Sequence, residues 1–206
     1  MLTRCRGVLV LPMKIILLST FLCSGFLFAQ DKPNTPANPE TKTKIELFQN
    51  RKGGVVIKSF EKLFELPFYF YGKKMTACEG EVELWELIDG GSGEKVYGIK
   101  ISVPILGGRH GTEKIGEDNV FLDADEVDAV IKGIEYILAY EAGKTKYKDW
   151  QVDFKSKAGF EVSTFSSEEG TKYAVDTGRE TRIYPRSEIE SLKEAFVKAK
   201  GMLGSK

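Results

Sequence analysis

The chain has one histidine, His110, which lies beside Arg109 in the glycine-rich stretch GGRHGTEKIGEDN, residues 107–119. An arginine next to a histidine could bind an anionic group, and the histidine would make that binding depend on pH near its usual pKa of about 6.5. Nucleophilic catalysis would also require a nucleophile and an orienting acid. The chain has no Gly-x-Ser-x-Gly elbow. We therefore predict no catalytic residue, and Arg109 and His110 are candidates for ligand binding only.

A second candidate binding surface is the aromatic run ELPFYFY, residues 65–71. On a strand, Tyr69 and Tyr71 would point to one side of the sheet and the neighbouring phenylalanines to the other. One of these faces is expected to pack in a core. The tyrosine face either lies against another layer or binds a ligand, so Tyr69 and Tyr71 are the other two candidate ligand-binding residues.

Metal and phosphate chemistry is not predicted. The chain offers no pair of histidines or cysteines for zinc. Asp123, Asp125 and Asp128 resemble the start of a calcium-binding loop. That loop would require an oxygen ligand where Val127 stands and a glycine where Asp128 stands. The Gly-Lys-Thr triplet at 143–145 resembles the end of a P-loop, but it follows a predicted helix instead of beginning one. We expect no bound metal and no cofactor.

The first 29 residues are predicted to be a signal peptide. MKIILLSTFLCSGFLFAQD, residues 13–31, has a lysine followed by an apolar run that ends at Ala29. As a helix this run of 15 residues would be about 22 Å long at about 1.5 Å per residue, short of the roughly 30 Å of a membrane span. Cleavage is expected after Ala29 or after Gly25, and Met13 is an alternative start.

Charge and cysteine content restrict what the rest of the chain can bind and how it is cross-linked. The leader holds three of the 30 basic residues and none of the 30 acidic ones, so the remainder carries a formal charge of −3. Nucleic-acid-binding proteins usually carry a basic excess, so nucleic acid is not an expected partner. Cys78 is the only cysteine after the leader, which excludes an intramolecular disulfide. Its side chain is either a small buried apolar group or a reactive thiol.

The spacing of apolar residues predicts the secondary structure. Residues 30–44 are polar and proline-rich, which predicts a disordered spacer. Clusters rich in β-branched and aromatic residues then predict strands, with 82–88 as a central one; these clusters are VVIKSF, ELPFYFY, VELWELI and VYGIKISVPI. Helical spacing predicts a helix over 124–142, which the capping-box spacing of Asp123 and Glu126 begins. No transmembrane helix is predicted after the leader.

The second half follows the same plan. Four strands are predicted from WQVDFKS, FEVSTFS, TKYAVDT and ETRIYP. A second helix is predicted over RSEIESLKEAFVKAKGML, with Pro185 in its first turn. We therefore predict an α+β fold of two pseudo-repeated antiparallel β-meander-plus-helix units, residues 45–143 and 144–206, in one compact domain. Each helix is expected to pack on the sheet of its own unit, through Val127, Val130, Ile131, Ile134 and Leu138 in the first unit and Ile189, Leu192, Phe196 and Leu203 in the second.

An alignment of the two halves explains the glycine-rich stretch. Tyr97 aligns with Tyr173, and Asp125 aligns with Ser187. The first copy then has 14 more residues than the second, and GGRHGTEKIGEDN accounts for most of them. The second copy closes without such a segment. We interpret it as a loop insertion that is either tolerated slack or the place where a function was added.

Two meander-plus-helix units in succession resemble the element order of Whirly and PUR proteins, which bind single-stranded nucleic acid. The resemblance is one of element order alone, and the leader and the charge of −3 argue against that function. It implies a nucleic-acid-binding-like fold used for another ligand. The stretch LDADEVDAVIKGIEYI, with LFAQ at the end of the leader, also looks like exported bacterial proteins of no assigned role, including some from Bacteroidetes.

These observations together predict an exported, non-enzymatic binding or structural module of the cell envelope. It would be periplasmic or secreted, with an unknown protein, glycan or lipid as its partner. The alternative is a carboxylate-dependent hydrolase of the envelope, because Asp and Glu are abundant in the chain and such catalysis needs no local motif.

Overall fold

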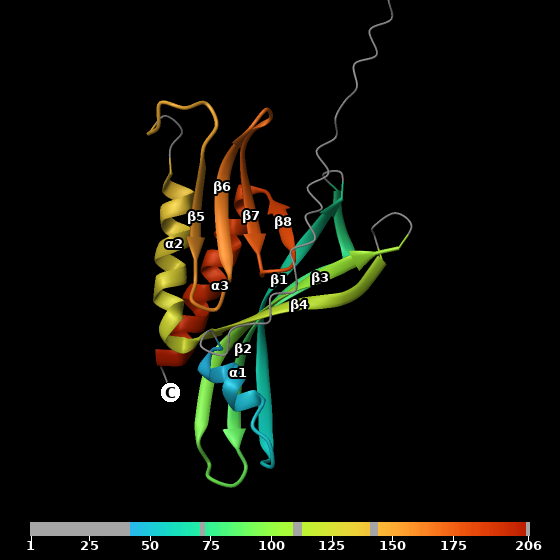
Figure 1. Ribbon diagram of the computed structural model, residues 1–206, viewed down its shortest axis with the longest axis vertical. Coiled ribbons are helices and arrows are strands. Elements are labelled where there is room, and N and C mark those ends of the chain that lie inside the picture. The colour runs from blue at the N-terminus through green and yellow to red at the C-terminus, as the bar shows by residue number, and fades with distance from the viewer. Residues whose placement is uncertain (1–41, 71–72, 109–112, 141–143, 205–206) are drawn as a thin grey trace, which may run out of the picture. The chain divides into compact units, whose positions relative to one another are not determined.

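The computed structural model describes residues 42–70, 73–108, 113–140 and 144–204. The predicted signal peptide, most of the predicted spacer, Tyr71, Arg109 and His110 lie outside these ranges, as does the side chain of Cys78. Within them the strands form two antiparallel sheets of four strands each, accompanied by helices (Figure 1). The predicted α+β class is therefore confirmed.

The elements follow one another as four strands and a helix, twice over. The first sheet, with strand order β1-β2-β3-β4, consists of β1 (Val56–Phe70), β2 (Lys73–Asp89), β3 (Lys95–Gly107) and β4 (Glu113–Asp123). A short helix, α1 (Lys44–Gln49), precedes it, and η2 (Ala124–Glu126) and α2 (Val127–Ala139) follow it. The second sheet, with order β5-β6-β7-β8, consists of β5 (Gln151–Lys155), β6 (Glu161–Ser167), β7 (Gly170–Asp176) and β8 (Thr181–Tyr184), and α3 (Arg186–Gly204) follows it.

The glycine-rich stretch proves to be partly strand. Residues 113–119 belong to β4, so their interpretation as a loop was wrong. The strands β3 and β4 have 13 and 11 residues, whereas their counterparts β7 and β8 have 7 and 4. The extra length of the first unit therefore extends a hairpin. VVIKSF and ELPFYFY, predicted as two strands, are parts of the single long strand β1.

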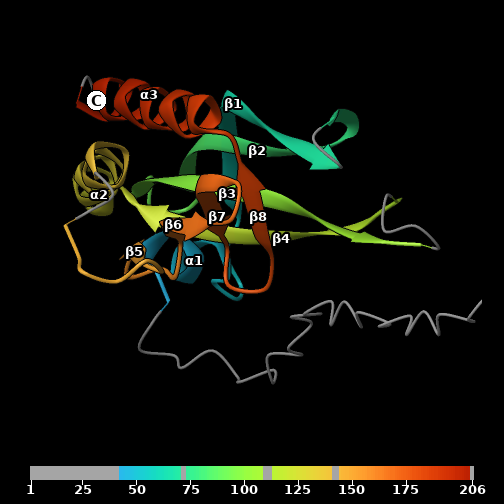
Figure 2. The ribbon, with the colours of Figure 1, turned by 90° about the horizontal axis from the view of Figure 1, so that it is seen from above.

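The two helices do not pack as predicted. The helical stripes are buried, but α2 lies against β5 and β6 of the second sheet, and α3 lies against β1 of the first sheet and also touches β7 (Figure 2). Periodicity identifies which face of a helix is buried but not the surface that buries it. Both sheets, α2 and α3 contribute to one hydrophobic core, so the two units are interlocked rather than stacked as independent halves.

Gly133 on α2 shows how closely this helix approaches β5. A Cβ placed on Gly133 would lie 2.2 Å from Cγ and Cδ2 of the Phe154 ring. Real Cβ atoms essentially never come this close to another heavy atom. The phenyl ring of β5 therefore occupies the space that any other residue at position 133 would fill.

A buried carboxylate on β4 fastens the first sheet to the second. Asp118 is buried, and its Oδ2 accepts hydrogen bonds from the Thr177 hydroxyl at 2.8 Å and from the backbone N–H groups of Arg179 at 2.9 Å and Glu180 at 3.2 Å. These groups form the turn between β7 and β8. Asp118 thus organises a turn that lies about 60 residues away in the chain.

Two more buried carboxylates act in the same way near the start of α2. Asp123 accepts hydrogen bonds from the backbone N–H groups of Lys44 at 2.9 Å and Ile45 at 3.1 Å, at the start of α1. Glu126 accepts one from the backbone N–H of Asp123, as the capping-box spacing predicts, and another from the backbone N–H of Lys157 in the β5–β6 turn at 2.9 Å. A carboxylate that accepts several N–H groups satisfies donors that would otherwise be buried without partners.

The helix α1 was not predicted, and it packs on the face of the first sheet opposite the main core. Ile45 and Phe48 are fully buried there against Leu87. A Cβ on Gly98 would lie 2.8 Å from Cδ1 of Ile45, so the glycine makes the notch into which this side chain fits. Thr43 caps the helix by accepting a hydrogen bond from the N–H of Glu46 at 3.3 Å.

Candidate functional site

A hollow of about 460 Å³ opens where β1 meets β7, β8 and the start of α3. Small-molecule sites are commonly clefts of about 300–1,000 Å³. We call this feature the tyrosine hollow because three tyrosines from three strands line it. Its lining residues are Tyr69, Thr171, Lys172, Tyr173, Ile183, Tyr184, Pro185 and Arg186.

The register of the second sheet brings two of these tyrosines together. Tyr173 on β7 and Tyr184 on β8 are directly opposite each other across the antiparallel pair. Directly opposed residues point to the same face of a sheet. Both are buried, at 6% and 4% exposure, and belong to the main core. Tyr69 arrives from β1 and packs against the edge of the same core.

Hydrogen bonds fix two of the three phenol groups. The Tyr69 hydroxyl donates to Oε1 of Glu188 at 2.7 Å. The Tyr173 oxygen accepts from Nη1 of Arg186 at 3.0 Å, while Nε of Arg186 donates to Glu190 at 2.8 Å. These contacts tie the hollow to the first turn of α3, so its wall is held by packing and by polar contacts together.

The third phenol differs from the other two. No described residue hydrogen-bonds to the Tyr184 hydroxyl, although the residue is only 4% exposed. Its oxygen is not among the buried atoms without a partner, so it reaches solvent through the hollow. Buried polar groups usually have a protein or water partner. Tyr184 therefore presents an unused hydroxyl to whatever enters the hollow.

Burial keeps two of these phenols, Tyr69 and Tyr184, protonated. Burial, together with the hydrogen bond to Glu188, raises the pKa of Tyr69 to about 12. Burial also raises the pKa of Tyr184 well above the usual value for tyrosine, and the nearby Glu188 and Tyr69 act in the same direction. The hydrogen bond to Glu190, followed by the bond to Tyr173, raises the pKa of Arg186. At neutral pH the phenols of Tyr69 and Tyr184 are thus neutral and the guanidinium of Arg186 is cationic.

Only one of the four candidate ligand-binding residues predicted from the sequence is among the described residues. The structure places Tyr69 in the hollow, while Tyr71, Arg109 and His110 lie outside the described residues. The other lining residues were missed. Tyr173 and Tyr184 lay in two predicted neighbouring strands, and a short turn between these strands would have placed the two tyrosines opposite each other.

A second, smaller hollow of about 390 Å³ lies between α2 and α3. Its lining includes three glutamates, Glu135, Glu190 and Glu194, together with Arg186 and Lys193. The three glutamates are exposed, and Glu190 is paired with Arg186. A carboxyl group that acts as a general acid is normally placed in an apolar or crowded setting. These solvated side chains do not have that setting.

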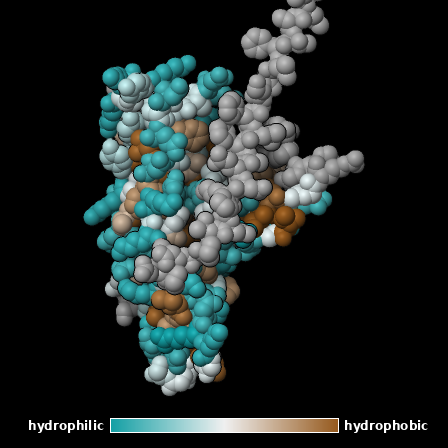
Figure 3. All heavy atoms as spheres, viewed as in Figure 1, coloured by the Kyte–Doolittle hydropathy of each residue, from teal (hydrophilic) through white to brown (hydrophobic). Residues whose placement is uncertain are grey.

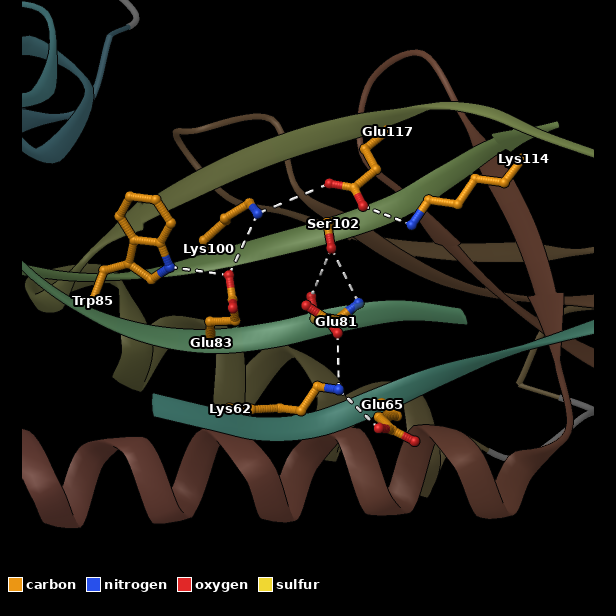
Figure 4. Close-up of polar contacts among 9 residues, drawn as sticks. All are labelled: Lys62, Glu65, Glu81, Glu83, Trp85, Lys100, Ser102, Lys114 and Glu117. Atoms are coloured by element: carbon orange, nitrogen blue, oxygen red, sulfur yellow. Dashed lines mark hydrogen bonds and ion pairs between the residues drawn. The ribbon is translucent and has the colours of Figure 1, made fainter. Parts of the chain in front are cut away.

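The face of the first sheet that carries α1 also carries a network of charged side chains (Figure 4). Lys62 pairs with Glu65 and with Glu81, each at 2.8 Å. Lys100 pairs with Glu83 at 3.3 Å, and Glu83 also accepts from the Trp85 indole N–H at 3.1 Å. The nine residues drawn in Figure 4 include three lysines and four glutamates, so this network has no basic excess.

The aromatic side chains beside this network extend the hydrophobic cluster that Ile45 and Phe48 of α1 form with Leu87. The ring of Trp85 stacks on Phe60 with centroids 5.8 Å apart and meets Phe121 edge-on at 5.6 Å. Trp85 and Phe121 both pack against the cluster of Ile45, Phe48 and Leu87. These rings are therefore explained by packing.

The described residues contain no group of three or more His, Cys, Asp or Glu side chains that could hold a metal ion. In the same part of the chain, no helix is long and apolar enough to cross a membrane. Comparisons with protein-family models, with curated proteins and with solved structures found no match to this chain.

Proposed function

We propose that the protein is an exported, non-enzymatic binding module of the cell envelope and that the tyrosine hollow is its ligand site. The observation that carries the proposal is the hollow itself, in which the hydroxyl of the buried Tyr184 has no partner among the described residues. A hydroxyl left unpaired at the wall of a hollow is the kind of polar group that fixes a small ligand.

Export rests on the leader. The lysine-led apolar run that ends in FLFAQD has the features of a secretory signal. The proline-rich segment after it would hold the folded part away from the envelope. N-terminal sequencing of protein from the native host tests this step. A cytoplasmic protein that begins at Met1 or Met13 would contradict export.

Ligand binding can be tested without knowing the ligand. Tagged full-length protein is recovered from its host, and small molecules that it retains are identified by mass spectrometry. Ile183 is 57% exposed and lines the hollow, so Ile183→Trp should fill the hollow without disturbing the core. Ile57 on β1 is similarly exposed, at 53%, and does not line the hollow, so Ile57→Trp is the matched control.

The outcomes of this comparison are distinct. A molecule retained by the native protein and by Ile57→Trp but not by Ile183→Trp would support the hollow as the site. Equal retention by both variants would refute the hollow. If the native protein retains no small molecule, the proposal that it is a small-ligand-binding module fails.

The hydrolase alternative depends on the second, smaller hollow, which lies between α2 and α3. Three glutamates line this hollow, which is the observation in favour of the hydrolase. Their exposure and the pairing of Glu190 with Arg186 are typical of a solvated helix surface. Hydrolysis of an envelope polysaccharide that Glu190→Gln abolishes would establish the alternative over the binding module.

A further inference from the structure

We infer that the tyrosine hollow recognises an oxyanion, either the carboxylate of an acidic sugar or a phosphate ester, on a ligand of about hexose size. This inference rests on the proposed ligand-binding function of the hollow. It is carried by the hydrogen-bonding capacity and the charge of the lining side chains.

The phenol groups that line the hollow have hydrogen-bond donors available for a ligand. The Tyr184 hydroxyl has no partner among the described residues. The Tyr173 oxygen already accepts from Arg186, which leaves its own proton for another acceptor. The raised pKa of Tyr184 keeps that phenol a donor at neutral pH. Two O–H donors on opposed strands favour a ligand that carries acceptor oxygens.

The charged side chains of the lining point to the same ligand chemistry. Among the described residues that line the hollow, Lys172 and Arg186 are cationic and none is acidic. Glu188 lies nearby, but it accepts the hydrogen bond of the Tyr69 hydroxyl at 2.7 Å. A cation together with hydroxyl donors is a common way to bind carboxylate and phosphate groups.

A ligand oxyanion can replace the carboxylates that pair with Lys172 and Arg186. Lys172 pairs with Glu169 at 2.7 Å, and the Glu169 side chain is 80% exposed. Arg186 pairs with Glu190 at 2.8 Å, where the Glu190 side chain is 49% exposed. Exposed pairs of this kind are weak because water screens them. A ligand oxyanion in the partly enclosed hollow can therefore take the place of Glu169 or Glu190.

The apolar residues at the rim of the hollow favour a ligand that carries a ring. Ile183 and Pro185 are apolar lining residues, and both are exposed. They provide contact surface for a ring without hydrogen-bonding demands. The hollow of about 460 Å³ admits a monosaccharide, which is smaller than a drug-sized ligand.

The test uses three sugars that share one ring: glucuronate, glucose 6-phosphate and glucose. Their dissociation constants for the full-length protein are measured by calorimetry. Tyr184→Phe removes one hydroxyl and keeps the packed ring, and Lys172→Gln removes one charge. Because Tyr184→Phe removes a hydrogen bond to a charged group, it should weaken binding of the acidic sugar about 10-fold or more. Tyr97→Phe is the matched control, since Tyr97 occupies the equivalent strand of the first sheet and donates to Glu86 outside the hollow.

Each outcome decides the inference. It is supported if an acidic sugar binds at least about 10-fold more tightly than glucose, and if Tyr184→Phe and Lys172→Gln lose this preference while Tyr97→Phe keeps it. Preference for glucuronate or for glucose 6-phosphate then identifies the carboxylate or the phosphate source. Equal affinity for glucose would overturn the oxyanion and leave the binding module standing. Acidic-sugar binding that both hollow variants retain, or no binding of either acid, would also overturn the inference. The retention experiment with Ile183→Trp decides the binding module separately.

Discussion

Substitution of Gly133 by alanine tests the way in which α2 packs on the second sheet. In an exposed helix interior, replacing glycine by alanine stabilises a protein by about 1 kcal/mol, because alanine loses less backbone entropy on folding. At Gly133 the added Cβ would lie 2.2 Å from two carbons of the Phe154 ring. Helix propensity and packing therefore act in opposite directions at this position.

The packing effect should dominate. Overpacking of a core typically costs about 1–3 kcal/mol. With two ring carbons at 2.2 Å and a third at 2.8 Å, either the ring or the helix must move, and we expect a cost near the upper end of that range. After the gain in helix propensity, Gly133→Ala should destabilise the protein by about 2 kcal/mol. For a domain of this size, that loss lowers the Tm by about 4–8 °C.

Two comparisons make the measurement specific. Gly201 lies in α3 with no atom within 4 Å of an added Cβ, so Gly201→Ala should raise the free energy of unfolding by about 0.5–1 kcal/mol. In the background of Phe154→Ala, where the ring is absent, Gly133→Ala should become neutral or stabilising. Urea unfolding of the native protein and the four variants measures both effects. If Gly133→Ala stabilises the native protein as Gly201→Ala does, α2 does not lie against β5 as described.

Three further predictions follow from buried groups and from one turn. Asp118→Ala should lower the free energy of unfolding by about 2–4 kcal/mol, because it leaves the donors of the β7–β8 turn without an acceptor, whereas the exposed Asp153→Ala should stay within about 0.5 kcal/mol in the same urea titration. Ile134→Ala in the fully buried stripe of α2 should cost about 2–5 kcal/mol by the same assay, and a loss below about 0.5 kcal/mol would contradict its place in the core. Hydrogen bonds from backbone N–H groups of the next turn hold the pKa of Asp89 below its usual value, so its stabilising effect should be present above its unfolded pKa of about 3.9 and lost as pH falls through the lower folded pKa. The Tm of Asp89→Asn should accordingly lie below that of the native protein at pH 7 and approach it in acid, and a difference that does not change with pH would refute this reasoning.

Local sequence patterns predicted the elements of this fold and the faces that they bury. The five residues predicted to be buried on α2 are all buried, and β2 is an interior strand, as the apolar groups on both faces of residues 82–88 indicated. These features depend on neighbours within a turn or a strand. They can therefore be read without knowing what lies across the core.

The features that were missed depend on long-range pairing. The segment EKIGEDN is poor in strand-forming residues, and it is a strand because β3 supplies its partners. The exchange of helices between the sheets leaves no local signal, since an apolar stripe fits either sheet. Helix α1 has only six residues, too few for periodicity, and its capping-box pair Thr43 and Glu46 was the available signal. The tyrosine hollow combines three strands and a helix, so sequence analysis found Tyr69 but not Tyr184.

The structure shows which part of the glycine-rich stretch the fold can lose. Beyond Ser102, β3 no longer pairs with β2, so residues 103–107 and their partners on β4 form a two-stranded arm. This arm is the pale green hairpin that extends from the sheet in Figure 1, and hydrophobic surface lies over it in Figure 3. Ile115 on the arm is 66% exposed, and the main core does not include it. The arm beyond Pro104 is therefore not required for the core, whereas at its base Val103 belongs to the core and Asp118 holds the β7–β8 turn.

Two deletions distinguish the arm from its base. The first deletion joins Pro104 to Glu117 through Asn-Gly, and these two residues are directly paired. It keeps Asp118 and uses a favoured two-residue hairpin turn. This shortened protein should fold with a loss of less than about 1 kcal/mol, since halving a loop changes the closure entropy by only about 0.6 kcal/mol. Replacing 107–119 by the same turn removes Asp118 and joins strand positions that are not opposite each other, so we expect a loss of at least the about 2–4 kcal/mol of Asp118→Ala. Urea unfolding of both proteins provides the measurement. If the longer deletion is as stable as the shorter one, Asp118 does not fasten the two sheets together.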